Sequence, residues 1–212
     1  MSIENEILNY LRDKETWVFC IKDMLIFGEY KSVAKAIERL TIDNNIKRVI
    51  QGVYYYPLIN KLFNVEYPPE IDDIAGAISR NNGWEIRETG SSVLRKFGLD
   101  NQISNSYVYL SSGPYRTYEI GNRIIKFRTA AQSNFKVSEK SSMIIQALKT
   151  LGEVNITGRE LMKISNCLTI EEKKRIKIEM KYAPIWMHEY LSKIGETPKN
   201  AQNVKSSIGF YR

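Results

Sequence analysis

An amphipathic helix followed at once by a tight hairpin, within residues 31–57, constrains the fold of this chain more than any other feature. At about 100° per residue, the apolar residues of the helix predicted over 31–41 share one side. That side carries Val33, Ile37 and Leu40. The polar residues Ser32, Lys35 and Arg39 lie within about 60° of one another on a side turned well away from it. The pattern predicts a helix that buries one face and presents cations on another.

Two β-rich runs follow this helix after a turn predicted at 43–45. The runs 46–50 and 53–56 are joined by Gln51-Gly52, which is the spacing of a two-residue hairpin. Pro57 ends the second run, because proline lacks the N–H that a strand ladder needs.

The residues before the helix complete an order of elements. Ser2 is placed to cap a first helix, 17–19 is predicted to be a short strand, and 21–25 marks a second helix that Gly28 closes in a left-handed turn. Helix, short strand, helix, turn, helix and hairpin is the order of a winged helix-turn-helix. In that geometry the third helix enters the major groove of DNA and the hairpin forms the wing.

The distribution of charge agrees with a polyanionic partner. Residues 1–30 hold three basic and six acidic side chains, whereas residues 31–61 hold six basic and two acidic ones, in a chain of net charge +7. A basic helix face is often only a solvated surface, and the order of elements is what favours DNA. The predicted DNA-binding residues are Lys31, Ser32, Lys35, Arg39, Lys47, Arg48 and Gln51.

The predicted fold class is α+β, with a winged helix-turn-helix over 1–64, a small antiparallel-sheet α+β domain over 70–135, a helical region over 136–198 and a polar tail over 199–212. Residues 64–70, which contain Pro68-Pro69, are predicted to be a linker.

The pattern after the linker predicts helices and then strands. Helices are expected over 71–80 and 91–97, and strands over 84–87, 107–110, 115–120 and 123–128, the last three as an antiparallel meander. Further helices are expected to start at Ser138, Thr157, Thr169 and near Pro184.

Basic residues on the last hairpin could hold an acidic partner or a nucleic acid, although a solvated strand face explains them equally well. They are Arg116, Arg123, Lys126 and Arg128, of which Lys126 and Arg128 have the spacing of one strand face.

The composition favours a globular cytoplasmic protein. The chain has no signal-peptide pattern at its start and no apolar run of the length of a membrane span, so no membrane association is expected. Cys20 and Cys167 lie in apolar sequence without a metal-binding spacing, which predicts reduced structural thiols and no cofactor.

No catalytic motif occurs in the sequence, and the chain is predicted not to be an enzyme. The single histidine, His188, is predicted to be structural. One alternative is a metal-dependent nuclease that uses Asp72, Asp73 and Glu88, although adjacent aspartates at a helix start are better explained by the helix dipole.

The run from Asp23 to Pro57 resembles the N-terminal domain of AbiEi-type antitoxins. The likeness rests on Val33, Ala36, Leu40, Ile46, Arg48 and the segment Gly52-Val53-Tyr54-Tyr55-Tyr56-Pro57. It continues with lower specificity through Ala75-Gly76-Ala77, Trp84, Gly90, Phe97-Gly98-Leu99, Gln102 and Arg123-Ile124-Ile125-Lys126-Phe127, and covers about residues 1–130. Asn45 and Ser104 depart from the family pattern, which usually has glycine and proline at these places.

The resemblance implies an antitoxin that also represses transcription of its own toxin-antitoxin operon, with a nucleotidyltransferase-like toxin encoded beside it. Its partners would then be double-stranded promoter DNA, on which it would act as a dimer, and that toxin. The alternatives are a stand-alone DNA-binding regulator and a protein-interaction module that blocks a toxin without touching DNA.

Overall fold

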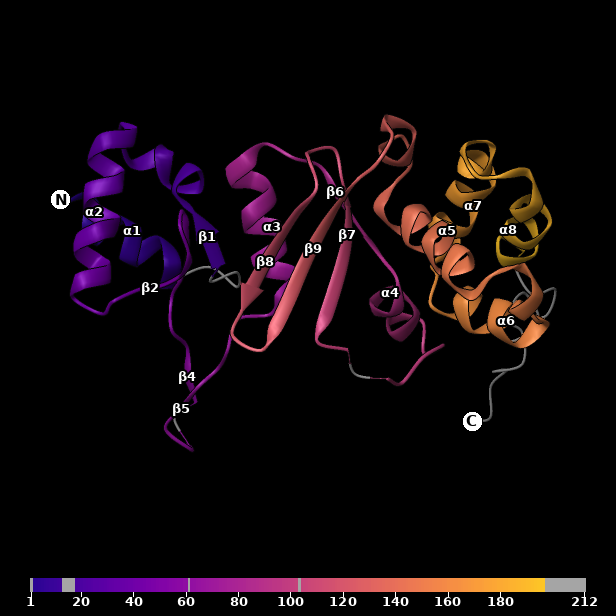
Figure 1. Cartoon of the computed structure of the whole chain (residues 1–212), viewed down its shortest axis with the longest axis horizontal. Coiled ribbons are helices and arrows are strands. Elements are labelled where there is room, and N and C mark those ends of the chain that lie inside the picture. Colours follow the sequence, from indigo (N-terminus) through magenta and orange to yellow (C-terminus); the bar gives the residue numbers. More distant parts are fainter. Residues whose placement is uncertain (1, 13–17, 61, 103, 197–212) are drawn as a thin grey trace, which may run out of the picture. The chain divides into compact units, whose positions relative to one another are not determined.

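The computed structural model describes residues 2–12, 18–60, 62–102 and 104–196 (Figure 1). The fold class is α+β, as the sequence predicted. The described residues form two compact units. Unit 1 takes its residues from Met1–Ile86 and Asn105–Ala130, and unit 2 takes its residues from Arg87–Ser104 and Ala131–Arg212. This division differs from the predicted domains, because the first helices and the later strands belong to one compact unit.

Unit 1 begins with the elements that the sequence predicted up to the hairpin. They are α1 (Ile3–Arg12), β1 (Val18–Cys20), the 3-10 helix η1 (Ile21–Phe27), α2 (Tyr30–Ile42), β2 (Lys47–Ile50) and β3 (Val53–Tyr55). The second helix is 3-10 rather than α, and Gly28 has φ 154° and ψ −174°, which is not the left-handed helical turn expected. Trp17, the first residue of the predicted strand, lies outside the described residues.

A three-stranded antiparallel sheet with the order β1-β3-β2 closes this part of unit 1. Cys20 lies opposite Val53 in one ladder, and Lys47 lies opposite Tyr55 in the other. The apolar sides of α1, η1 and α2 pack together beside it in one cluster. That cluster contains Ile7, Leu11, Phe19, Met24, Val33, Ala36, Ile37, Leu40 and Ile46.

The predicted linker, residues 64–70, begins inside a small hairpin that starts before it. Strands β4 (Ile59–Asn60) and β5 (Val65–Glu66) pair antiparallel, and Asn60 Oδ1 accepts the backbone N–H of Leu62 at 2.9 Å. Short polar side chains such as that of Asn60 favour turns because they bond backbone groups two residues on. Each strand has only two residues, which is too short to show an alternating pattern in the sequence.

The second sheet lies mostly in unit 1, and it is mixed rather than the antiparallel meander expected. Its order is β6-β7-β9-β8, from strands β6 (Ile86–Thr89), β7 (Ser106–Ser111), β8 (Arg116–Ile120) and β9 (Arg123–Thr129). Strand β9 lies between the other two members of the predicted meander, parallel to β7 and antiparallel to β8. The sequence showed three strands and two turns, but those turns do not determine which strands become neighbours.

Helix α3 (Ile71–Asn82) joins the two sheets into one core. Its buried residues pack with Val18 and Val53 of the first sheet and with Ile125 and Phe127 of the second. Because α3 buries apolar side chains against both sheets, the first sheet and the strands after residue 105 belong to the same unit.

An ion pair also fastens η1 to α3. Arg80 donates to both carboxylate oxygens of Asp23, with Nε 2.9 Å from Oδ1 and Nη2 2.9 Å from Oδ2. The same carboxylate accepts the backbone N–H of Cys20 at 3.0 Å. Burial raises the pKa of Asp23, but the hydrogen bonds from Arg80 and Cys20 outweigh it and leave the pKa below its ordinary value.

We expect Asp23→Asn to lower the free energy of unfolding by about 1 kcal/mol near pH 6, because the pair is only partly buried. The folded pKa lies below the ordinary value of 3.8. The contribution is therefore present above about pH 5 and is lost as the pH falls through the folded pKa. Urea unfolding of both proteins from pH 6 down to pH 2 should show their difference shrinking below about pH 4. A difference that grows on acidification would contradict this assignment.

Unit 2 is helical except for its part of β6. Its elements are α4 (Ser91–Lys96), η2 (Gln132–Phe135), α5 (Glu139–Leu151), η3 (Glu153–Asn155), α6 (Gly158–Asn166), α7 (Ile170–Glu179), η4 (Met180–Tyr182), η5 (Ile185–Met187) and α8 (His188–Ile194). The predicted starts are confirmed: Ser138, Thr157 and Thr169 are the capping residues of α5, α6 and α7. Pro184 precedes η5, which leads directly into α8.

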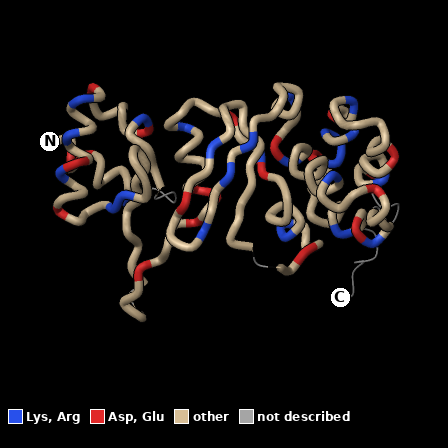
Figure 2. Tube along the Cα trace, in the orientation of Figure 1, with Lys and Arg blue, Asp and Glu red and all other residues tan. Residues whose placement is uncertain are grey.

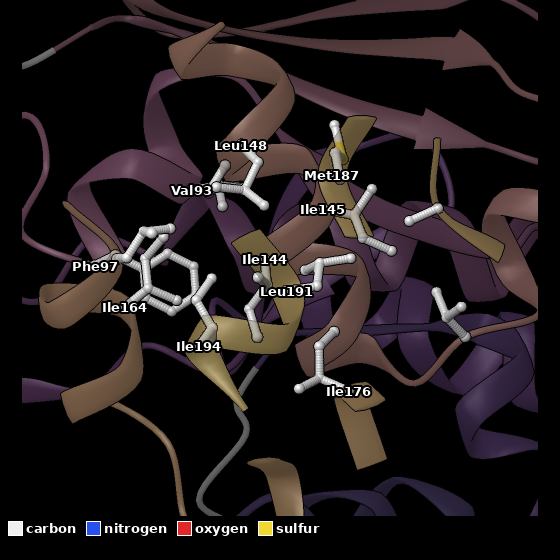
Figure 3. Close-up of a cluster of buried hydrophobic side chains, with 14 of the residues drawn as sticks. Val93, Phe97, Ile144, Ile145, Leu148, Ile164, Ile176, Met187, Leu191 and Ile194 are labelled. Atoms are coloured by element: carbon white, nitrogen blue, oxygen red, sulfur yellow. The ribbon is translucent and has the colours of Figure 1, made fainter. Parts of the chain in front are cut away.

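The core of unit 2 is a single apolar cluster that these helices share (Figure 3). Ile144 and Leu148 of α5 pack there with Ile164 of α6, Ile176 of α7 and Leu191 of α8. Cys167 is exposed at the end of α6, contrary to the apolar setting expected for it, whereas Cys20 is buried. None of the described helices is both long and apolar enough to cross a membrane.

Candidate nucleic-acid interface

Helix α2 keeps one face for the core and leaves the opposite face to solvent. Val33, Ala36, Ile37 and Leu40 are buried, while Lys31 and Lys35 are exposed. The division predicted by the helical wheel is therefore present. Figure 2 shows the basic residues spaced along this helix.

The exposed face of α2 and strand β2 border a concavity of about 830 Å³. Its lining residues are Ile21, Tyr30, Lys31, Ala34, Lys35, Glu38, Thr41, Ile42, Arg48 and Tyr54. Three of these are basic and one is acidic. The structure thus brings Lys31, Lys35 and Arg48 of the predicted set to one surface.

A second concavity, of about 660 Å³, adjoins the first and shares Ile21, Tyr30, Arg48 and Tyr54 with it. It extends past Gln51 to Asn81 and Asn82 at the end of α3. Gln51 therefore lies on the continuation of the same surface, separated from Lys35 by Arg48.

The turn of the predicted wing packs against α3. Gly52 is buried at φ +81°, and a Cβ atom there would lie 2.9 Å from Nδ2 of Asn81. Only glycine adopts this conformation readily and leaves room for the close approach. The turn is therefore packed against α3 and does not project freely into solvent. Arg48, on the strand before the turn, is the basic residue of the hairpin that lines the concavity.

Arg39 lies on the flank of α2 that faces α1. Arg39 Nη1 donates to Oε1 of Glu4 at 2.8 Å, and the pKa of Glu4 is lowered by a backbone hydrogen bond and then by Arg39. Neither Arg39 nor Ser32 lines the concavity that holds Lys35. Of the predicted group Ser32, Lys35 and Arg39, only Lys35 therefore lines the concavity.

We expect Arg39→Ala to weaken DNA binding less than about threefold, because Glu4 already neutralises this arginine away from the concavity. Lys35→Ala should weaken binding about tenfold, as expected for loss of a phosphate or base contact. Fluorescence anisotropy with one labelled duplex at fixed salt compares the two variants. An Arg39→Ala loss equal to that of Lys35→Ala would place both residues on the interface and contradict the assignment.

Lys47 is engaged by the β4–β5 hairpin rather than by the concavity. Its Nζ donates to Glu66 Oε2, and the hydroxyl of Tyr55 donates to Oε1 of the same carboxylate at 2.6 Å. Burial and the bond to Glu66 raise the pKa of Tyr55 to about 12. Lys47, which was predicted to contact DNA, is paired with Glu66 and does not line the concavity.

Strand register divides the four basic residues predicted as a partner surface. Arg116 lies opposite Phe127 and Arg123 lies opposite Ile120, so both arginines belong to the sheet face that carries buried Phe127. Lys126 and Arg128 belong to the opposite face, as their spacing predicted. Arg123 donates to the carbonyl of Pro69 at 3.3 Å, which ties the start of α3 to the sheet.

Two of the three carboxylates considered for metal-dependent cleavage have partners of their own. Asp72 accepts a hydrogen bond from the hydroxyl of Tyr109, and Glu88 pairs with Nζ of Lys96 at 2.6 Å. Burial and then the charge of Asp72 raise the pKa of Asp73. Within the described residues, no three His, Cys, Asp or Glu side chains are grouped to hold a metal ion.

His188 Nε2 lies 3.2 Å from the carbonyl oxygen of Ala183, at hydrogen-bonding distance. The bond joins the first residue of α8 to the segment between η4 and η5, which is a structural use of the ring.

Sequence reasoning missed several residues of the concavity. Tyr30, Glu38, Ile42 and Tyr54 line it, and Ile42 is 71% exposed. Ile42 directly follows the predicted helix, and a helix extended to it would place Ile42 on the same side as Lys35, seven residues earlier, which was the available signal for it. Tyr54 could not be placed from its strand alone.

Comparisons with known proteins yield a family and a distant structure. No curated protein matches the sequence significantly. The solved structure of the Rv2827c protein from Mycobacterium tuberculosis is similar at a TM-score of 0.45 and 10% identity, over 92% of this chain and 78% of that chain. Residues 4–176 match the family of unknown function DUF6088, and the chain belongs to this family.

Proposed function

We propose that this chain is a DNA-binding transcriptional regulator that places α2 and strand β2 on duplex DNA, as a winged helix-turn-helix does. The observation that carries the proposal is the convergence of Lys31, Lys35 and Arg48 around one concavity on the outer face of α2. These residues come from two elements whose order and pairing suit that motif.

The chemistry of the concavity suits a major groove. Duplex DNA is a dense line of phosphates, which basic side chains at the rim can neutralise. Glu38 is able to accept a hydrogen bond from a cytosine amino group, and Ala34 and Ile42 offer apolar contact to thymine methyl groups. The same helix face therefore offers both positioning and base-reading contacts.

The proposed target of regulation is the operon that encodes this chain. The resemblance to AbiEi-type antitoxins supports autorepression by two copies on inverted repeats, in the cytoplasm, and neutralisation of a nucleotidyltransferase-like toxin encoded beside it. A stand-alone regulator without a toxin is the alternative. If the chain is an antitoxin, its expression together with the neighbouring toxin should restore the growth that the toxin inhibits. If it is a stand-alone regulator, growth should stay inhibited.

The test of DNA binding is a titration of a labelled duplex from upstream of the gene against a scrambled duplex of equal length. The proposal expects tighter binding to the upstream duplex and an affinity that falls linearly with the logarithm of salt concentration, because bound phosphates release counterions. Equal affinity for both duplexes would indicate only charge attraction. No binding at low salt would contradict the proposal outright.

A further inference from the structure

A cavity of about 350 Å³ lies within unit 2, between α5, η2 and the segment that joins η4 to η5. Its lining residues are Ser133, Asn134, Val137, Ser142, Ile145, Gln146, Lys149, Tyr182, Ala183 and Pro184. The volume is at the small end of the range of pockets that hold metabolites. All these residues belong to one compact unit, so the cavity is formed within it.

Ser142 is the unusual residue of this cavity. It is 2% exposed, and its Oγ is buried with no hydrogen-bond partner in the described part of the chain. A helical serine often returns its proton to a carbonyl one turn earlier, as Thr150 does to Gln146 O at 2.8 Å. Ser142 does not do so, and buried polar groups are almost always paired. A hydroxyl left in this state on a cavity wall points to a ligand that pairs with it.

Two further donors share this face of α5. Ser142, Gln146 and Lys149 follow at spacings of four and three residues, which places them in line along one helix face. Gln146 is 4% exposed, and its Oε1 accepts a hydrogen bond from Thr89 Oγ1 at 3.2 Å. The group that Gln146 can offer to a ligand is therefore its NH₂ donor.

The charge of the lining selects the sign of the ligand. Lys149 is the one charged residue among the lining residues, and no Asp or Glu is among them. One ammonium, one amide NH₂ and one hydroxyl suit a singly charged carboxylate. The apolar side chains of Val137 and Ile145 beside them leave room for a short hydrocarbon part.

We propose that this cavity binds a small monocarboxylate with a short apolar chain, held by Ser142, Gln146 and Lys149. The carboxylate accepts hydrogen bonds from the three donors, and the chain packs against Val137, Ile145 and Pro184. The proposal does not depend on DNA binding, because every residue that it uses lies in unit 2.

NMR titration of the full chain with acetate, pentanoate and inorganic phosphate tests this proposal. Pentanoate is expected to bind more tightly than acetate, because its chain occupies the apolar wall, and more tightly than phosphate. The largest shifts are expected at residues 142, 145, 146 and 149. Saturable binding of none of the three probes, or tightest binding of phosphate, would overturn the proposal.

Variants locate the site. Ser142→Ala should weaken pentanoate binding about tenfold and Lys149→Met about threefold, since Lys149 is exposed and its charge is screened. Lys149→Met changes a surface residue and should leave folding intact, so it still measures the role of the cavity if Ser142→Ala affects folding. Lys174→Met, an exposed lysine of α7 outside the cavity, is the control and should bind as the wild type does. Unchanged binding in both cavity variants would mean that Ser142 is paired only by water, and would overturn the proposal.

Discussion

Replacing Lys35 and Arg48 together by alanine is expected to weaken binding to the upstream duplex about 100-fold at fixed salt, since each lost contact is worth about 1–3 kcal/mol. Both side chains are exposed and line the concavity beside α2. The slope of log affinity against log salt should fall in magnitude by about 2 if both contact phosphates. Surface changes of this kind leave stability within about 0.5 kcal/mol, so the loss would report binding.

The matched control removes the same charge elsewhere. Arg159 and Lys174 are exposed residues of unit 2, and Arg159→Ala with Lys174→Ala lowers the net charge equally. This variant should bind DNA within about threefold of the wild type, because these residues lie outside the proposed interface. If both double variants lost affinity equally, net charge rather than the concavity would account for binding.

Phe127→Ala is expected to lower the free energy of unfolding of unit 1 by about 3–5 kcal/mol. Phe127 is fully buried, and its ring lies 5.7 Å from that of Trp84 and 5.8 Å from those of Tyr109 and Tyr118, between centroids. Removing it leaves a cavity among three rings that cannot close by a simple rotamer change. Urea unfolding measures the loss.

Tyr115→Ala is the control for that measurement. Tyr115 is an aromatic residue near the same sheet that is 61% exposed, so its removal should change stability by less than about 0.5 kcal/mol. Because α3 joins Phe127 to the β1-β3-β2 sheet, hydrogen exchange in that sheet should also quicken in Phe127→Ala. Unchanged exchange there would show that the two sheets do not unfold together.

Local signals predicted the elements of this fold well. The starts at Ser138, Thr157 and Thr169 were correct because a capping side chain bonds backbone groups within its own turn. The buried side of α2 was also predicted correctly, because helical spacing alone places Val33, Ile37 and Leu40 together.

Contacts between distant segments were the part that sequence reasoning could not supply. Arg39 is paired with Glu4, 35 residues away, and Lys47 with Glu66, 19 residues away. Arg39 and Lys47 were assigned to DNA because the sequence around each of them did not show its acidic partner. The place of β9 between β7 and β8, and the role of α3 between two sheets, also depend on packing that no local pattern encodes.

The claim that α2 faces DNA is tested most directly by site-specific photo-cross-linking. A photoreactive amino acid in place of Ile42, which lines the concavity, is predicted to cross-link to the upstream duplex. The same group in place of Val154, which is 97% exposed in unit 2, should give no cross-link. Cross-linking at Val154 with none at Ile42 would contradict the account.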